Sequence, residues 1–317
     1  MQTIHLLAPA KINVYLRITG RRADGYHLLD SLMIPVSLCD ELHIGVERRQ
    51  AAGDRRQQLL VPDLRHPISN TRAEAADWEP RIVLTCGDST VPGDETNLAY
   101  KAAALLMKET GARASVSIRL QKRIPAGAGL GGGSSDAAAV LKGLNTLLQL
   151  GLTEARLCAI GARLGADVPF FIPCRPARVA GIGEILTPVP PLAHRWIVLV
   201  APPFGVSTPW AYRRFDELPP SPSLTASFAE VNRGQWPAQE LFINDLERAV
   251  LPAYPQITAI KSILLTHGAE GALMSGSGSS VFGIFHERRS AENARNTLQA
   301  YGEVFLLEPL SEPLLSS

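Results

Sequence analysis

The sequence predicts an α+β protein built from two domains. Its 317 residues are too many for one ordinary core, given roughly 100–200 residues per domain. Strand-like alternation and helical spacing both recur along the chain, and towards the C-terminus the strands and helices segregate as in a small α+β sandwich. The hydrophobic fraction of 46% and the charged fraction of 19% are typical of an ordinary folded protein.

Strands are expected first. Residues 5–18 are apolar and rich in β-branched side chains, with a break at Pro9, which predicts two short strands around a polar step and then a loop over residues 20–25. Residues 40–46 alternate between apolar and polar side chains, as in a half-buried strand. Residues 48–80 lose all periodicity, so we interpret them as an insertion or long loop around at most one strand.

A helix and a further strand follow. Residues 97–109 carry apolar side chains at helical spacing, and Gly111 is placed to end that helix. Residues 114–120 alternate strictly, which predicts a strand with one polar face.

Two more helices are expected after the most glycine-rich part of the chain. Residues 137–150 are rich in alanine and leucine, and Thr153 can cap a second helix that ends near Gly165.

Beyond Pro173 the composition turns towards proline and glycine, which indicates a domain boundary. We divide the chain into an N-terminal domain, residues 1–180, and a C-terminal domain, residues 181–317. The second part is expected to contain, in order, a buried strand (196–200), an irregular segment (202–239), helices (within 244–267), a hairpin (271–285), a helix (291–301) and a last strand (304–307).

Composition excludes several classes of protein. The chain has 31 Lys and Arg against 30 Asp and Glu, so it lacks the basic excess of a nucleic-acid-binding protein. Its four cysteines form no C-x-x-C pair, which favours reduced thiols and a cytoplasmic location. No segment reaches about 18 consecutive apolar residues, so we expect no membrane span. The histidines other than His27 show no metal-ligand spacing, and we expect no dedicated metal site.

The segment from Gly127 to Gly133 contains five glycines in seven positions, immediately before a predicted helix. Bare backbone N–H groups can wrap phosphate oxygens there, and the positive end of the helix points at the same place. A flexible linker is the alternative, but linkers rarely connect a strand directly to a helix. A dinucleotide-binding loop is excluded because no second strand follows the helix, and a P-loop because no G-K-[ST] closes it.

Three motifs together carry a resemblance to a known family: Ala8 to Asn13, Pro125 to Ala138, and Met274 to Phe282. In this order they resemble the three motifs of the galactokinase, homoserine kinase, mevalonate kinase and phosphomevalonate kinase (GHMP) superfamily. The resemblance implies an N-terminal α/β domain with a left-handed βαβ unit and a ferredoxin-like C-terminal α/β sandwich. It also implies a small-molecule kinase that uses ATP and Mg²⁺.

Ala126 and Ala128 depart from the family's usual Met and Gly, a mild change because alanine is small. The resemblance assigns ATP binding to Pro125, Ala126, Gly127, Ala128, Gly129, Leu130, Gly131, Gly132, Gly133, Ser134 and Ser135. Ser134 or Ser135 is expected nearest to Mg²⁺, which phosphates and water would otherwise hold.

The same resemblance assigns catalysis to Lys11 and Asp167. Asp167 can accept the proton of the acceptor hydroxyl, and Lys11 can stabilise the charge that develops. Without the resemblance, a turn-forming aspartate and a solvated lysine would be equally good interpretations. Whether Asp167 is a true base or chiefly a positioning group stays open.

Three further stretches, residues 20–27, 165–171 and 181–184, are similar to the superfamily members that phosphorylate a cytidine diphosphate alcohol in isoprenoid biosynthesis. That similarity implies a small-molecule substrate bound by Asn13, Tyr26, His27, Tyr212, Ser277 and Gly278, in a monomer or homodimer. The rival interpretations are another kinase of the superfamily, a decarboxylating lyase of the same fold, and a nucleotide-binding regulator without catalysis.

Overall fold

The computed structural model describes residues 1–48, 81–88, 91–221 and 228–312. The expected insertion at 48–80 therefore lies outside the described residues, apart from Arg48. Within the described part, no helix is long and apolar enough to cross a membrane.

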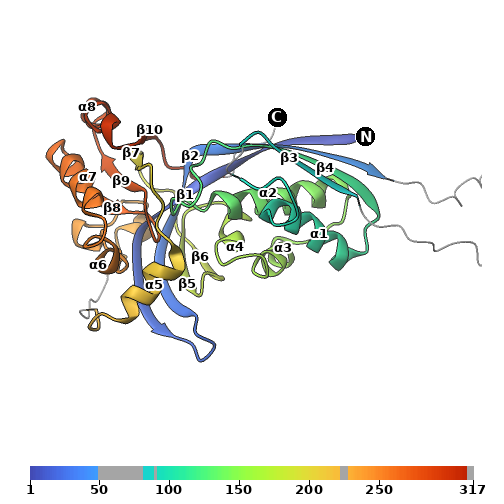
Figure 1. The fold of residues 1–317 in the computed structure, drawn as a ribbon, viewed down its shortest axis with the longest axis horizontal. Coiled ribbons are helices and arrows are strands. Elements are labelled where there is room, and N and C mark those ends of the chain that lie inside the picture. The colour runs from blue at the N-terminus through green and yellow to red at the C-terminus, as the bar shows by residue number, and fades with distance from the viewer. Residues whose placement is uncertain (49–80, 89–90, 222–227, 313–317) are drawn as a thin grey trace, which may run out of the picture.

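The N-terminal part is built on a six-stranded sheet in which β1 pairs with β2 and the remaining order is β3-β4-β2-β5-β6. Its strands are β1 (Gln2–Arg21), β2 (His27–Arg48), β3 (Ile82–Cys86), β4 (Ala114–Gln121), β5 (Ala177–Gly181) and β6 (Ile185–Pro188). The antiparallel β1–β2 hairpin is by far the longest element, and its tip reaches towards the C-terminal half (Figure 1).

The prediction of two short strands broken at Pro9 was wrong. Residues 2–21 form one continuous strand, because the register of β1 against β2 shifts between Pro9 and Ala10. Such an irregularity lets a strand absorb a residue that cannot donate to the ladder. Lys11 and Asn13 consequently lie in the middle of a strand, where alternation puts both side chains on one face.

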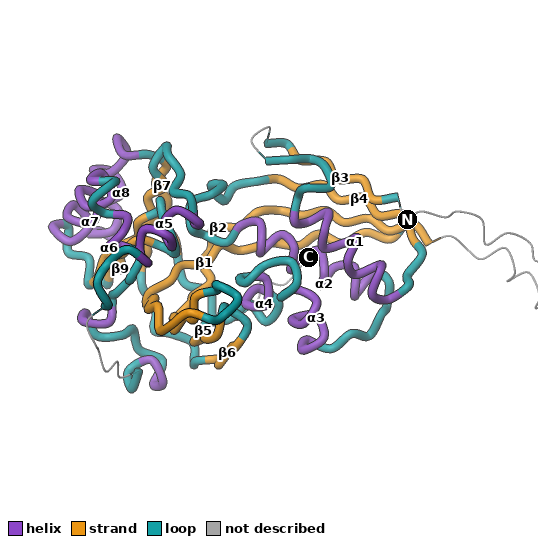
Figure 2. The backbone as a smooth tube through the Cα atoms, turned by 60° about the horizontal axis from the view of Figure 1, so that its bottom comes forward, coloured by secondary structure: helices purple, strands orange, loops and turns teal. Residues whose placement is uncertain are grey.

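Helices cover one face of this sheet (Figure 2). They are α1 (Leu98–Thr110), α2 (Gly132–Leu147), α3 (Glu154–Gly161) and α4 (Val168–Phe171). The expected end of α1 is confirmed, since Gly111 adopts the left-handed conformation with φ 67°. At its start, Asn97 caps the helix rather than belonging to it, because its side chain accepts from the Ala99 N–H at 2.8 Å. Thr153 likewise caps α3.

Two N-terminal features differ from the prediction. Helix α2 begins at Gly132 rather than Ala137, because Gly131 supplies the left-handed turn that precedes it. Strand β3 was not predicted; it pairs parallel with β4, and α1 connects the two strands. This β3–α1–β4 crossover is the βαβ unit that the resemblance implied.

The C-terminal part contains a four-stranded sheet in the order β10-β7-β9-β8, covered by helices. This is the expected ferredoxin-like arrangement. Its elements are β7 (Trp196–Ala201), α5 (Thr208–Asp216), η1 (Val231–Arg233), η2 (Gln239–Leu241), α6 (Glu247–Val250), α7 (Pro255–Thr266), β8 (Gly271–Met274), β9 (Val281–Phe285), α8 (Arg288–Thr297), η3 (Leu298–Tyr301) and β10 (Glu303–Leu307).

The prediction that residues 202–239 are irregular was wrong for α5. Only Ala211 of this helix is buried, so α5 lacks the wide apolar stripe by which helices are recognised. Its start was nevertheless readable, since Ser207 caps the helix and Pro209 occupies its first turn.

Buried side chains join the two parts of the molecule. One core cluster combines residues of the β1–β2 hairpin, such as Ile12 and Ile34, with residues of the second sheet, such as Leu199 and Phe282. The first sheet ends with β6 at Pro188 and the second begins with β7 at Trp196. The division into residues 1–180 and 181–317 stays a prediction.

Candidate active site

A cavity of about 1160 Å³ opens where β1, the β1–β2 turn, the glycine loop and α5 converge. Most of the residues that the sequence assigned to a site line it. They are Lys11, Asn13, Tyr26, His27, Asp167, Tyr212, Ser277 and every residue from Pro125 to Ser134.

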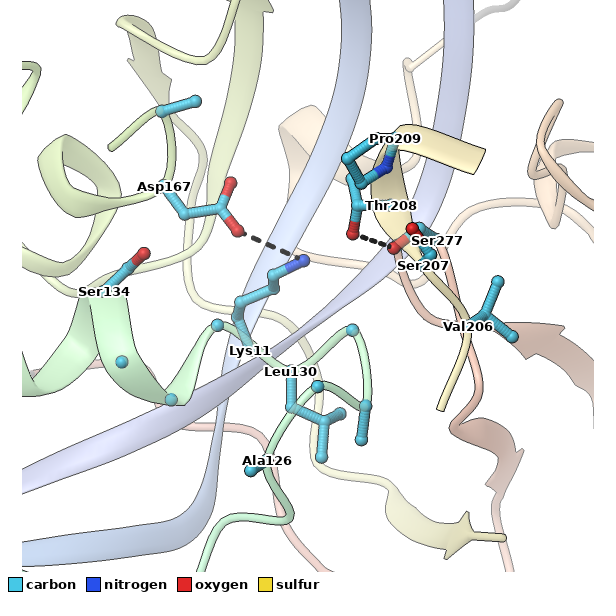
Figure 3. A pocket seen from close by; sticks show the side chains of 18 of the residues that line it. Lys11, Ala126, Leu130, Ser134, Asp167, Val206, Ser207, Thr208, Pro209 and Ser277 are labelled. Carbon is cyan, nitrogen blue, oxygen red and sulfur yellow. Dashed lines mark hydrogen bonds and ion pairs between the residues drawn. The ribbon is translucent and has the colours of Figure 1, made fainter. Parts of the chain in front are cut away.

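Lys11 and Asp167 face each other in this cavity (Figure 3). The Nζ atom of Lys11 lies 3.5 Å from Oδ2 of Asp167. The lysine side chain is 4% exposed, whereas the aspartate is 30% exposed, so the carboxylate remains open to a ligand. Because the backbone N–H of Lys11 donates to the Leu130 carbonyl at 3.0 Å, the glycine loop is bound directly to β1.

Asp167 occupies the residue before α4, yet its side chain caps nothing. An aspartate that only formed a turn would be expected to hydrogen-bond to the nearby backbone, and Asp167 makes no such cap. Pro169 lies in the first turn of α4, so the helix begins there without help from the carboxylate. The carboxylate is left to pair with Lys11.

A buried hydrogen-bond chain fixes the direction of the lysine. Lys11 Nζ donates to Asn13 Oδ1 at 2.6 Å, and Asn13 Nδ2 donates to Ser31 Oγ at 2.8 Å. Ser31 in turn donates to the Tyr15 carbonyl at 2.6 Å. These contacts define which way the Asn13 amide points, with its oxygen towards the ammonium.

The glycine loop presents the start of α2 to the cavity. Gly132, Gly133 and Ser134 form the first turn, where backbone N–H groups have no acceptor within the helix. Gly131 precedes them at φ 72°, and a Cβ there would lie 2.9 Å from the Phe171 ring, so only glycine fits. Ser134 lines the cavity, but Ser135 is buried at 2% exposure and its Oγ has no hydrogen-bond partner.

The third motif packs closely against the glycine loop. Ser275 Oγ donates to the Gly129 carbonyl at 3.0 Å, and a Cβ on Gly129 would lie 2.2 Å from the Ser275 carbonyl oxygen. Ser277 reaches the cavity and shares a 2.7 Å hydrogen bond with Thr208 of α5. Gly278, also expected to bind substrate, does not line the cavity; its Cα faces the side chain of Met274.

The far end of the cavity is aromatic. The His27 ring stacks on Tyr212 with centroids 4.7 Å apart, and Tyr26 is 60% exposed beside them. His27 Nε2 lies 2.6 Å from Asp216 Oδ1, and Arg21 lies 3.2 Å from the other oxygen of the same carboxylate. Burial, and then the negative charge of Asp167, raise the pKa of the Tyr212 hydroxyl.

Sequence reasoning missed a buried group of three charges at the base of the cavity. Lys122 contacts Asp40 and lies 2.8 Å from Asp136. Burial raises the pKa of Asp136 to about 7, although Lys122 opposes that rise. Burial lowers the pKa of Lys122, but the two carboxylates outweigh it and the net shift is upward. A lysine at the end of a strand gave no signal of burial.

Asp216 and Thr208 were also missed, because α5 itself was not predicted. A helix over residues 208–216 would have placed Asp216 one turn beyond Tyr212, on the same face. That spacing was the available signal.

Comparisons with known proteins agree with this geometry. The chain matches the model of the GHMP kinases N-terminal domain over residues 97–174 and that of the GHMP kinases C-terminal domain over residues 225–304. A protein of Citrifermentans bemidjiense named 4-diphosphocytidyl-2-C-methyl-D-erythritol kinase is 42% identical over 296 residues, covering 93% of this chain and 94% of that protein. One of the same name from Symbiobacterium thermophilum is 42% identical over 285 residues, covering 89% and 90%.

Solved structures give the same result. A crystal structure of 4-(cytidine 5'-diphospho)-2C-methyl-D-erythritol kinase superimposes with a TM-score of 0.72 at 34% identity, covering 96% of this chain and 99% of that one. A homoserine kinase from Cytophaga hutchinsonii reaches a TM-score of 0.70 at 18% identity, covering 100% and 97%, and shares the fold.

Proposed function

This chain belongs to the 4-diphosphocytidyl-2-C-methyl-D-erythritol kinase family of the GHMP kinases, and from that membership we propose its reaction. It transfers the γ-phosphate of ATP to the 2-hydroxyl of 4-diphosphocytidyl-2-C-methyl-D-erythritol, giving the 2-phosphate and ADP. The step belongs to the methylerythritol phosphate route to isoprenoids. The four free thiols support a cytoplasmic location.

The observation that carries the proposal is the meeting of Lys11 with Asp167, 3.5 Å apart, beside the glycine loop. The two residues come from distant parts of the chain and converge at the wall where a phosphate-binding helix begins. Phosphoryl transfer mainly requires alignment of the hydroxyl and neutralisation of spreading charge, which such a pair provides. A structural ion pair would not need to line a large cavity.

Each residue of the pair has a separate task. Asp167 accepts the proton of the acceptor hydroxyl or holds that hydroxyl in line with the phosphate, and its 30% exposure leaves room for the alcohol. Lys11 stabilises the charge on the transferring group, and its buried position strengthens that interaction. Asn13 holds the ammonium in place through its own hydrogen bond to Ser31.

ATP binds along residues 125–134, with its phosphates at the first turn of α2. Mg²⁺ neutralises phosphate charge when it is bound with ATP. Ser134 fits such an ion better than Ser135, because its hydroxyl is at the cavity wall while Ser135 is buried. Among the described residues lining the cavity, no cluster of carboxylates forms a dedicated cage, which suits an ion held chiefly by phosphates and water.

The cytidine end binds at Tyr26, His27 and Tyr212. Aromatic rings supply stacking surfaces for a pyrimidine, and an imidazole nitrogen can meet its hydrogen-bonding edge. When His27 Nε2–H donates a hydrogen bond to Asp216, the neutral ring keeps a lone pair on Nδ1 that can accept from the exocyclic amine of cytosine.

The proposal is tested by ADP release with 4-diphosphocytidyl-2-C-methyl-D-erythritol, homoserine and mevalonate as acceptors. We expect turnover with the cytidine compound alone. Lys11→Ala and Asp167→Asn should each lower kcat by at least about 100-fold, the usual contribution of a positioned acid or base. Lys142→Ala, outside the cavity, is the control for removing a half-buried lysine.

Near-normal turnover in either active-site variant would contradict the assignment of that residue. Turnover with homoserine or mevalonate instead would place the chain elsewhere in the superfamily. Release of CO₂ together with ADP would identify a decarboxylating lyase.

A further inference from the structure

A group of two histidines and a glutamate lies on the face of the first sheet that the helices leave open. Ile4 and Leu6 point towards α2, since a Cβ on Gly143 would lie 3.5 and 2.9 Å from their side chains. Alternation along β1 therefore turns His5 to the opposite face. The register of β1 on β2 sets His5 directly across from His43.

No metal-ligand spacing links these histidines along the sequence, and the sequence assigned them no chemistry. Only the pairing of two distant strand segments brings them together, and Glu41 lies two residues before His43 on the same face. The residues of this cluster are far apart in the sequence and become neighbours only through the register of β1 on β2.

The three side chains offer donor atoms at a single point. One ligand atom from each of His5, Glu41 and His43 lies within 4.8 Å of the other two. The imidazole rings stack with centroids 4.4 Å apart and an interplanar angle of 18°, and His5 Nε2 lies 3.9 Å from Glu41 Oε2.

An unsatisfied nitrogen of His5 is a second, independent observation at this cluster. Its Nε2 atom is buried and has no hydrogen-bond partner, since 3.9 Å to the glutamate exceeds hydrogen-bonding distance. A buried polar atom without a partner destabilises a folded protein. A cation at this point would satisfy that nitrogen.

We propose that His5, Glu41 and His43 bind a divalent transition-metal cation, with Zn²⁺ as the ion that the donor set suits best. Imidazole and carboxylate donors are typical of zinc, and three protein ligands leave a fourth position for water. The donor atoms move closer together on binding by rotation of side chains, which the exposed His43 and the half-buried Glu41 permit. None of the three residues lines the catalytic cavity, so this ion is separate from the Mg²⁺ of the kinase reaction.

Neighbouring charges limit the affinity. Arg123 lies 2.5 Å from Glu41 Oε1 and leaves Oε2 for the ion, while Arg119 lies opposite His43 on β4. Positive charge near a dication is unfavourable. These arginines should therefore weaken binding of the cation.

The test is calorimetric titration of Zn²⁺ into tag-free protein that has been dialysed against a chelator. Wild type, His43→Ala and His5→Ala are compared with His286→Ala, which removes an exposed histidine beside Glu287. We expect one equivalent bound by wild type and by His286→Ala, and an affinity at least about tenfold weaker in the two site variants. Zn²⁺ should raise the Tm of wild type but not of His43→Ala, because the ion binds the native state.

A Tm measurement without metal shows whether each variant is folded, and the exposed His43 makes its variant the most informative. The proposal is overturned if wild type binds no Zn²⁺. It is equally overturned if folded His43→Ala binds like wild type, which would assign the ion to other groups such as the thiols.

Discussion

Lys11 illustrates what single residues contribute to the site and where sequence reasoning stopped. Its identity and its pairing with Asp167 were expected from the resemblance. Its direction was not, because that depends on Asn13, Ser31 and the Tyr15 carbonyl, which only the β1–β2 register brings together. Asn13 was expected to contact the substrate. Its hydrogen bonds show that it also positions the Lys11 ammonium.

The Asp216 carboxylate offers a test of recognition at the cytidine end. Asp216→Asn removes the charged acceptor of His27 Nε2 and of Arg21, and should raise KM for the cytidine substrate about tenfold, as expected for a hydrogen bond to a charged group. KM for ATP should stay unchanged. Preference for the cytidine over the uridine analogue should fall, because the imidazole tautomer is no longer fixed.

Glu217→Gln is the matched control, since this neighbouring carboxylate pairs only with exposed Arg214 among the contacts of the described chain. Equal KM values for Asp216→Asn and the control would mean that the carboxylate does not orient His27.

Asp136 gives the protein a predictable dependence of stability on pH. Its pKa is about 7 in the folded protein, against 3.8 for an ordinary aspartate. Below the lower value both states are protonated; between the two values the unfolded chain releases a proton that the folded protein keeps. Unfolding therefore becomes easier as pH rises through this window.

Asp136→Asn cannot ionise and should gain stability relative to wild type as pH rises. Urea unfolding of both proteins at about pH 5 and about pH 8 measures the difference directly, with exposed Glu287→Gln as the control. A difference that is constant or shrinks with pH would show that Asp136 is ionised throughout.

At the scale of elements, clear local signals were sufficient for most of the fold. Gly111 and Thr153 marked helix ends correctly, because caps depend on the local side chain and backbone conformation. Strand β3 and helix α5 escaped because each is stabilised by neighbours rather than by its own pattern: β3 by pairing with β4, and α5 by contacts with the β1–β2 turn.

A comparison of two glycines can separate two effects of substitution: loss of the close contact between the glycine motifs, and loss of the positive-φ conformation that glycine tolerates. Gly127 and Gly129 both have positive φ, at 66° and 77°, but a Cβ on Gly127 meets nothing within 4 Å. Gly129→Ala should therefore destabilise the protein by about 2 kcal/mol more than Gly127→Ala, which carries only the left-handed penalty. Denaturant unfolding without nucleotide measures both; equal losses would mean that the two motifs adjust to each other easily.

At the scale of the molecule, residues 243–245 connect β1 to the C-terminal part. The Leu16 N–H of β1 donates to the Ile243 carbonyl, and the Asp245 N–H donates to the Leu16 carbonyl. The Asn244 side chain donates to the carbonyls of Met274 and Gly276. The two domains were predicted from length and composition. Their shared interior could not be, because it depends on which faces of two sheets meet.

Asp245 tests this connection. Its nearly buried carboxylate accepts from Arg17 Nε at 3.0 Å and from the Ile18 N–H at 2.9 Å. Asp245→Asn should lower the free energy of unfolding by about 2 kcal/mol, because it weakens charge-assisted bonds at a buried site. Asp24→Asn, which disrupts a half-exposed pair with Arg22, should cost less than about 1 kcal/mol. Similar losses would show that Asp245 behaves as a surface charge.

The β1–β2 hairpin carries Lys11, the lysine proposed for phosphoryl transfer, midway along one strand, and at its tip the residues proposed to recognise the nucleobase. Under the proposal, the residues for phosphoryl transfer and those for substrate selectivity thus lie on one hairpin but at separate positions. Replacing the residues of the hairpin tip alone should therefore change which alcohol is accepted, without altering the strand register that positions the Lys11 ammonium.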